Sequence, residues 1–185
     1  MISRRVARIV IGGVVIANLC AGGAALYASA AGVEIKLNES HSLPRGLYVR
    51  TGDPIMYGSL VWFRLPGVMN EYFSTVEMRG EHRTMAEWYA APGNGELKPV
   101  VGMEGDTICR QGVQFSINGK HLGDALLVGP SLWWLPRWEG CRTLASDELA
   151  VFSDRIPDSV DSRYYGAIKR DGAMPYRPWL VESPR

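Results

Sequence analysis

The residues best suited to chemistry lie in one stretch, from Asn38 to Tyr48, which reads Asn-Glu-Ser-His-Ser-Leu-Pro-Arg-Gly-Leu-Tyr. Its two serines, Ser40 and Ser42, would turn their hydroxyls toward the same face of an extended backbone. Pro44 and Gly46 favour a turn directly after them. A serine held at such a turn can be the nucleophile of an acyl transfer, provided that a neighbouring group takes its proton. Without that group, the stretch is an ordinary polar loop.

Lys98 is the candidate for the proton acceptor. It precedes two valines and a Gly-X-X-Gly-Asp turn from Gly102 to Asp106. A lysine is usually a solvated surface charge. Burial disfavours the charged form, however, and lowers the pKa of a lysine amine toward neutral pH, where the amine can accept a hydroxyl proton. Ser42 and Lys98 together therefore predict a nucleophile and its general base.

Length and charge limit the other classes of function. The 185 residues suffice for one well-buried domain with an appendage, but not for two full-sized domains. The 20 Lys and Arg residues nearly balance 19 Asp and Glu residues without a basic stripe, which argues against a nucleic-acid partner. The three histidines, His41, His82 and His121, show no ligand spacing, so we expect no metal site. We also expect no cofactor.

The composition of residues 1–33 predicts a short basic cytoplasmic segment followed by a membrane anchor. The run from Ile9 to Val33 carries no charge and is long enough to span a bilayer as a helix. Three arginines between Arg4 and Arg8 precede it, so the positive-inside rule leaves the N-terminus in the cytoplasm. A cleaved secretory signal is the alternative, because Ala28-Ser29-Ala30 resembles a cleavage site. We expect a single-pass membrane protein, with residues 34–185 forming its exported domain.

Two of the three cysteines belong to that exported domain. Cys20 lies within the apolar run, where it acts as a small hydrophobic residue. Cys109 and Cys141 remain, and an oxidising compartment favours a disulfide between them. The alternative is two unpaired buried thiols.

The rest of the sequence predicts mainly strands with one helical insertion. Strands are indicated by apolar runs at residues 47–50, 60–65, 97–101 and 148–152, and by the alternating segment 113–120 with its Asn-Gly turn. Between about residues 68 and 92, apolar residues recur at helical spacing and predict one or two short helices. This insertion is either a cap that faces the substrate or a solvated excursion. The tail, with Pro175, Pro178 and Pro184, is predicted to be irregular.

Two later segments have an unusual composition. Residues 132–138 contain three tryptophans, which indicate an exposed contact patch or a covered loop. Residues 153–166 contain three aspartates, three serines and two arginines, which predicts a polar network that supports a site.

Three motifs, taken in order, resemble the type I signal peptidase family. They are Ser-X-Ser-Leu-Pro-X-Gly from Ser40, Leu-Lys-Pro-Val-Val-Gly-Met-Glu-Gly-Asp from Leu97, and Asp-Glu-Leu followed by Asp-Ser-Val-Asp-Ser-Arg-Tyr-Tyr-Gly up to Gly166. The first motif is most similar to the conjugal-transfer (TraF-type) branch of Ser-Lys peptidases, which is associated with plasmid transfer and pilin maturation. The resemblance implies a mainly β fold of antiparallel coiled sheets, with a small helical insertion and an N-terminal transmembrane helix.

By this resemblance, Ser42 is the nucleophile and Lys98 is the general base of a Ser-Lys dyad. The lysine takes the hydroxyl proton and later returns a proton to the leaving amine. Ser40 and the backbone N–H of Ser42 form the oxyanion hole.

The same resemblance assigns supporting roles to four residues of the loop 153–166. Ser159 carries a hydroxyl that orients the lysine. Asp161 and Arg163 form a structural ion pair, and Asp154 is an acidic support residue.

Several residues depart from the family pattern. Leu43 follows the serine where the family usually has Met, and Pro44 lies one place nearer the serine than in general signal peptidases, which is the form of the transfer-type branch. Ser153 and Arg155 stand where Gly and Asn are common, and Pro99 follows the lysine, a replacement that suits an edge or bulge position. None of these departures removes an atom of the dyad.

The sequence thus predicts a membrane-anchored serine endopeptidase that processes an exported precursor, above all a conjugative pilin subunit. Hydrolysis and cyclisation of the pilin share one acyl intermediate, and the sequence does not separate them. The expected partners are an exported pilin or preprotein, the inner membrane, and components of a transfer or type IV secretion apparatus. The alternatives are a general type I signal peptidase and a catalytically silent scaffold of such an apparatus.

Overall fold

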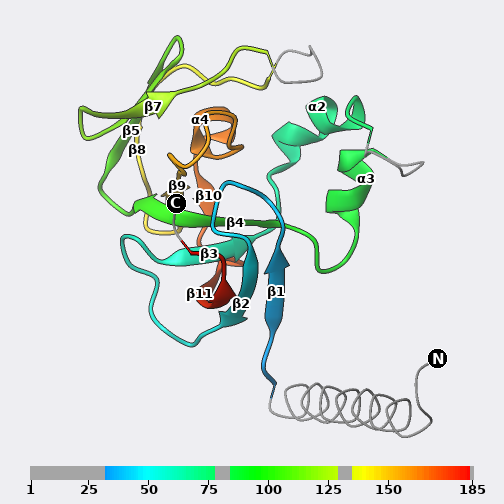
Figure 1. Cartoon of the computed structure of the whole chain (residues 1–185). Helices are drawn as coiled ribbons and strands as arrows, with labels where there is room; N and C mark the ends of the chain where they lie inside the picture. Colours follow the sequence, from blue (N-terminus) through cyan, green and yellow to red (C-terminus); the bar gives the residue numbers. More distant parts are fainter. Residues whose placement is uncertain (1–31, 78–83, 129–134, 184–185) are drawn as a thin grey trace, which may run out of the picture. The chain divides into compact units, whose positions relative to one another are not determined.

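A computed structural model describes residues 32–77, 84–128 and 135–183. In these ranges the chain is mainly β, as the sequence predicts, and its strands form two sheets (Figure 1). The larger sheet has seven strands in the order β1-β2-β11-β3-β4-β9-β10, and the smaller has four in the order β7-β6-β5-β8. The strands are β1 Ile35–Asn38, β2 Gly46–Arg50, β3 Leu60–Phe63, β4 Glu96–Gly102, β5 Thr107–Gln111, β6 Gln114–Ile117, β7 Lys120–Asp124, β8 Gly140–Thr143, β9 Glu148–Val151, β10 Ile168–Lys169 and β11 Met174–Val181.

Strand β4 lies in the interior of the larger sheet, antiparallel to β3 on one side and to β9 on the other. Val61 of β3 and Val100 of β4 belong to one buried apolar cluster, and such burial is the main favourable contribution to folding. Lys98 is paired with Val61, so the same core fixes its backbone. Pro99 precedes a register shift between Val100 and Gly102, and a strand proline is tolerated at such an irregularity.

The smaller sheet is built on a tight hairpin. Ile108 and Phe115 are fully buried in its core cluster. Asn118 and Gly119 have φ angles of 52° and 77°, a conformation that asparagine and glycine adopt most readily, and they join β6 to β7. The Asn-Gly hairpin predicted from the sequence is therefore present.

The described part of the segment for which the sequence predicts short helices, residues 67–77 and 84–92, contains three of them. They are η1 Gly67–Met69, α2 Asn70–Ser74 and α3 Met85–Ala90. Thr84 and Glu87 form a capping box that begins α3. The rings of Phe73 and Tyr89 lie 5.1 Å apart and join α2 to α3, which lie side by side (Figure 1). Helices this short are marginal alone, so packing holds them in place.

The C-terminal tail differs from the prediction. Its prolines favour irregular structure, but Met174–Val181 form β11, which pairs with β2 on one side and with β3 on the other. The buried Tyr176 anchors this strand in an apolar cluster. Pro178 borders a register shift in the pairing with β2, where a missing N–H costs little. The prediction of an irregular tail is therefore wrong, because pairing on both sides outweighs local composition.

The predicted anchor, residues 9–33, lies almost wholly outside the described residues, which begin at residue 32. No helix among the described residues is both long and apolar enough to span a bilayer. The aromatic segment 132–138 is likewise described only from Leu135 onward.

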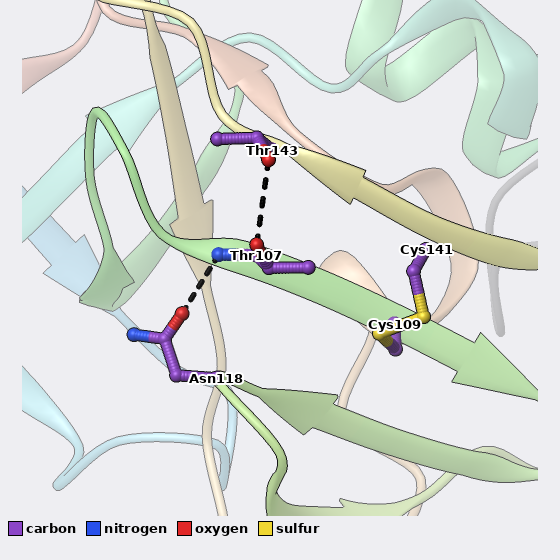
Figure 2. The surroundings of a disulfide bond; sticks show 5 residues. All are labelled: Thr107, Cys109, Asn118, Cys141 and Thr143. Carbon is purple, nitrogen blue, oxygen red and sulfur yellow. Dashed lines mark hydrogen bonds between the residues drawn. A yellow bond between two sulfur atoms is a disulfide. The ribbon is translucent and has the colours of Figure 1, made fainter.

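Cys109 and Cys141 form a disulfide between the neighbouring strands β5 and β8 (Figure 2). Thr107 and Thr143 extend the link along the same two strands, because their hydroxyl oxygens lie 3.3 Å apart. On the other side of β5, the side-chain oxygen of Asn118 accepts a hydrogen bond from the Thr107 N–H at 2.8 Å. The disulfide and the contact between Thr107 and Thr143 fasten β8, most of whose residues are exposed, to β5.

We expect the disulfide to stabilise the fold. Its two cysteines are separated by 32 positions. Closing a loop of that length restricts the unfolded chain and raises its free energy by about 3–4 kcal/mol. Replacing Cys109 and Cys141 by alanine should lower the free energy of unfolding by this amount, measured by denaturant titration. Reductant should lower the stability of the wild type similarly and leave the double variant unchanged. Equal stability of wild type and variant would contradict the prediction.

We expect Gly95→Ala to destabilise the approach to β4. A Cβ atom at this position would lie 2.4 Å from the carbonyl oxygen of Phe63 and 2.6 Å from the ring of Trp62. Overpacking of this kind costs about 1–3 kcal/mol. Gly52→Ala is the matched control, because nothing lies within 4 Å of a Cβ there. Thermal unfolding of both variants tests the prediction, and equal melting temperatures would contradict it.

Candidate active site

Ser42 and Lys98 lie in direct contact, although 56 positions separate them in the sequence. The Lys98 Nζ atom is 2.8 Å from the Ser42 Oγ atom, and each residue is only 2% exposed. The amine comes from the interior strand β4, and the hydroxyl comes from the loop 39–45 between β1 and β2. A hydroxyl and an amine at this distance have the geometry that proton transfer requires.

The loop 39–45 is here called the nucleophile loop, because it carries the candidate nucleophile Ser42. It is a turn, and not the extended backbone that the sequence analysis considered for Ser40 and Ser42. The side-chain amide of Asn38 donates hydrogen bonds to the carbonyls of Ser40 and Pro44 at 3.0 and 3.2 Å. The Tyr48 hydroxyl donates to the same Pro44 carbonyl at 2.6 Å. Since Asn38 ends β1 and Tyr48 belongs to β2, the loop is held at both ends.

Ser40 lies beside Ser42. Its hydroxyl oxygen is 2.8 Å from that of Ser42, and it donates a hydrogen bond to the side-chain oxygen of Asn38 at 3.0 Å. A hydroxyl can rotate between acceptors. Ser40 can therefore turn its proton toward a charged oxygen that develops next to Ser42, which is the requirement for an oxyanion hole.

The loop that follows β9 holds the nucleophile loop from a distant part of the chain. The Ser153 hydroxyl donates to the carbonyl of Ser42, and the Arg155 Nε–H donates to the carbonyl of His41 at 3.1 Å. Ser153 and Arg155 are two of the residues at which the sequence departs from the family pattern. Both bind the nucleophile loop directly, a role that the sequence analysis missed and that no local signal indicates.

Asp161 and Arg163 form a buried, two-pronged ion pair. The Nε and Nη2 atoms of Arg163 each lie 2.9 Å from one carboxylate oxygen of Asp161. Burial by itself would lower the pKa of Arg163, but the hydrogen bonds and charge of Asp161 raise it. Asp161 also accepts the backbone N–H of Ser153 at 3.2 Å. The pair thus fixes the loop whose Ser153 binds the Ser42 carbonyl.

The other two predicted support residues lie differently. Ser159 is buried and lines the same cavity as Lys98, but its hydroxyl has no hydrogen-bond partner among the described residues. Asp154 is exposed to solvent, outside the buried network of Asp161.

Glu96 is a further site residue that the sequence analysis missed. Its Oε2 atom lies 2.7 Å from the Lys98 Nζ atom, and its Oε1 atom accepts a hydrogen bond from the Tyr89 hydroxyl. Burial, with the nearby carboxylate, raises the pKa of Tyr89, so this hydroxyl keeps its proton. A signal was available, because residues two apart in a strand point to the same side.

A cavity of about 270 Å³ opens beside these groups. Ser40, Ser42, Glu96 and Lys98 are among the polar residues that line it. The helical segment contributes a largely apolar wall, formed by Tyr72, Phe73, Val76, Met85 and Tyr89. The helical insertion therefore faces the candidate active site, as the cap interpretation predicts. The cavity offers an apolar side chain of a peptide a place next to a hydroxyl and an amine.

No metal-binding cluster of three or more His, Cys, Asp or Glu side chains occurs in the described parts of the chain. The chemistry that the described site offers is that of a serine hydroxyl, a lysine amine and a carboxylate.

Comparison with known proteins places these residues in a family context. Two proteins of Escherichia coli, both named plasmid transfer protein TraF, are similar to this chain. One is 32% identical over 155 residues, which are 80% of this chain and 85% of that protein. The other is 29% identical over 174 residues, which are 92% and 91% of the two chains. A signal peptidase I structure from Enterococcus faecalis V583 is 16% identical, covers 66% of this chain and 96% of its own, and has a TM-score of 0.34.

The family match extends over most of the chain. Residues 7–174 match the family described as signal peptidase, peptidase S26. This range includes Ser42, Lys98 and the loop 153–166. The chain therefore belongs to the signal peptidase family, peptidase S26.

Proposed function

We propose that this chain is a serine endopeptidase that works through a dyad of Ser42 and Lys98. The observation that carries the proposal is the 2.8 Å contact between the Ser42 Oγ and Lys98 Nζ atoms, both buried at the wall of one cavity. A buried amine beside a hydroxyl is suited to take its proton. Membership of a peptidase family also supports the proposal that this chain is a peptidase.

The proposed acylation step uses the Ser42 hydroxyl as the nucleophile and the Lys98 amine as the base. Neutral Lys98 takes the proton of Ser42 while the Ser42 Oγ atom attacks the scissile carbonyl. The Ser40 hydroxyl and the Ser42 N–H stabilise the negative oxygen that forms. The carbon–nitrogen bond then breaks, and the lysine ammonium gives its proton to the leaving amine. Water, or a second amine, attacks the acyl-enzyme with Lys98 again as the base.

The proposed substrate is an exported precursor, most specifically a conjugative pilin subunit. Both E. coli relatives are named plasmid transfer proteins, which supports a role in conjugation. The largely apolar wall of the cavity is suited to an apolar segment of such a precursor. Attack by water would release a shortened pilin, whereas attack by the pilin's own N-terminus would close a ring.

The proposed location is the inner membrane, with one span, the N-terminus in the cytoplasm and the catalytic domain in the periplasm. The uncharged run from Ile9 to Val33 and the arginines before it support this topology. We propose components of a transfer or type IV secretion apparatus as further partners in the inner membrane.

We expect Ser42→Ala and Lys98→Ala each to abolish processing of the pilin precursor. Each variant removes one member of the dyad, so the rate should fall by roughly 10³-fold or more. Mass spectrometry of the precursor, co-expressed with each variant, measures cleavage and, for a ring, the further loss of one water.

Ser146→Ala and Lys120→Ala are the matched controls, because both residues are exposed. They should process the precursor at the wild-type rate. Unchanged pilus production with Ser42→Ala and Lys98→Ala would favour a silent scaffold. Equal cleavage of unrelated secretory precursors by the wild type would favour a general signal peptidase.

We expect residues 1–33 to remain in the mature protein as its membrane anchor. The protein should stay in the membrane fraction during alkaline extraction, because an apolar helix of this length inserts stably. The intact mass of the purified protein should include the N-terminal segment. A mass that begins after Ala30 would instead identify a cleaved signal.

A further inference from the structure

The dyad lysine has a second close partner that the simple Ser-Lys scheme does not use. The Lys98 Nζ atom lies 2.8 Å from the Ser42 hydroxyl and 2.7 Å from the Glu96 Oε2 atom. The side chain of Lys98 is 2% exposed, and that of Glu96 is 14% exposed. This is therefore a shielded contact between a base and a carboxylate, and not a solvated surface ion pair.

Glu96 is also held from its far side. Its Oε1 atom accepts a hydrogen bond from the hydroxyl of Tyr89, which α3 carries. The Phe73 ring packs against Tyr89 at 5.1 Å. The carboxylate is therefore oriented by the helical insertion, so that its other oxygen, Oε2, faces the lysine.

The other ionisable groups around the pair come from several elements. Tyr72 of α2 and Asp158 of the loop after β9 line the same cavity, and Tyr165 of α4, Ser162–Tyr165, lies close enough for the Glu96 charge to act on it. Asp161 is already bound to Arg163. Among the described residues, only the carboxylate of Glu96 lies within ion-pair distance of the Lys98 amine.

A general base must be neutral before it can take the serine proton, so the lysine must first lose one. The amine is almost sealed from water and has two close partners, the Ser42 hydroxyl and the Glu96 carboxylate. Of these two partners, only the carboxylate can take a proton from the ammonium. A peptide in the cavity would exclude the remaining water, and a charged pair loses stability relative to a neutral pair when water leaves.

We propose that Glu96 is the proton acceptor for Lys98 and thereby makes the amine neutral for catalysis. In this step one proton moves from Nζ to Oε2, the ammonium becomes an amine, and the carboxylate becomes a carboxylic acid. No proton enters or leaves the pair. Tyr89 continues to donate to Oε1, which stays an acceptor. The inference rests on the proposed dyad function and adds a residue to it.

The later proton transfers then follow without further change at Glu96. The neutral amine takes the Ser42 proton during attack, and the resulting ammonium gives it to the leaving amine. The same cycle serves the attack on the acyl-enzyme. Glu96 keeps its proton throughout, and Tyr89 acts as its positioning residue.

The test is the pH dependence of kcat/KM, measured with the benzyl thioester of acetyl-Ala-Ala-Ala and chromatography of the released thiol. A thioester needs no proton on its leaving group, so the rate reports activation of the serine. The rate of Ser42→Ala is subtracted at each pH as background. Measurements run from about pH 5 to about pH 10, and the acid limb of kcat/KM reports groups of the free enzyme.

We expect Glu96→Gln to lose activity selectively at low pH. Its lysine must release a proton to water, so the acid limb should move to higher pH by more than about one unit. At the alkaline end, where the amine is neutral in both proteins, the rates should converge. Tyr89→Phe keeps the carboxylate and should move the limb by less than Glu96→Gln does. Glu104→Gln, at an exposed position in the turn after β4, is the matched control and should leave the profile unchanged.

Three outcomes would overturn the inference while leaving the dyad in place. A limb that moves to lower pH, with a faster rate near neutrality, would mean that Glu96 only stabilises the ammonium. An unchanged profile would mean that Glu96 plays no part, and an equal loss at every pH would mean a purely structural role. Absence of any Ser42-dependent turnover in the wild type would overturn the dyad function itself, and this inference with it.

Discussion

A lysine amine that leaves water must be compensated by close polar partners, and the site depends on this constraint at Lys98. Removing one ammonium from water costs several kcal/mol unless hydrogen bonds and an opposite charge replace the solvent. Here the Ser42 hydroxyl and the Glu96 carboxylate supply that compensation at 2.8 and 2.7 Å. Burial in general disfavours the charged form of a lysine, which is why a buried amine beside a hydroxyl is suited to accept a proton. Much of the surrounding structure serves to keep these three groups together.

Two kinds of interaction hold the lysine and the serine. Apolar packing in the sheet holds the backbone of Lys98, whereas hydrogen bonds hold the loop of Ser42. Lys98 sits on an interior strand whose neighbours belong to the apolar core, so its backbone has little freedom. Ser42 sits on a loop, which needs hydrogen bonds to replace that packing. Asn38 supplies them from one side and Ser153 from the other, and the buried Asp161 fixes Ser153 in turn. A chain of hydrogen bonds therefore fixes the position of the serine, as the packed sheet fixes that of the lysine.

The helical insertion contacts both the cavity and the Glu96 carboxylate. Short helices have little intrinsic stability, and α2 and α3 are held by aromatic contacts such as that between Phe73 and Tyr89. The same side chains form much of the apolar wall of the cavity, and Tyr89 also binds Glu96. A segment packed against this wall would therefore alter both the water content of the cavity and the environment of the carboxylate.

The amino-acid sequence alone indicated the mainly β class and the Asn-Gly hairpin, because local residue patterns favour strands and this turn. It also named Ser42 and Lys98 as candidates for a serine nucleophile and its base, and the structure brings their side chains into contact. Only the tertiary structure decided that the proline-rich tail is the strand β11, since pairing with β2 and β3 involves partners far away in the chain. It also decided the roles of Ser153, whose acceptor is 111 positions away, and of Glu96, whose second oxygen is held by α3. Local patterns specify which groups can react, whereas burial and long-range contacts decide which of them meet.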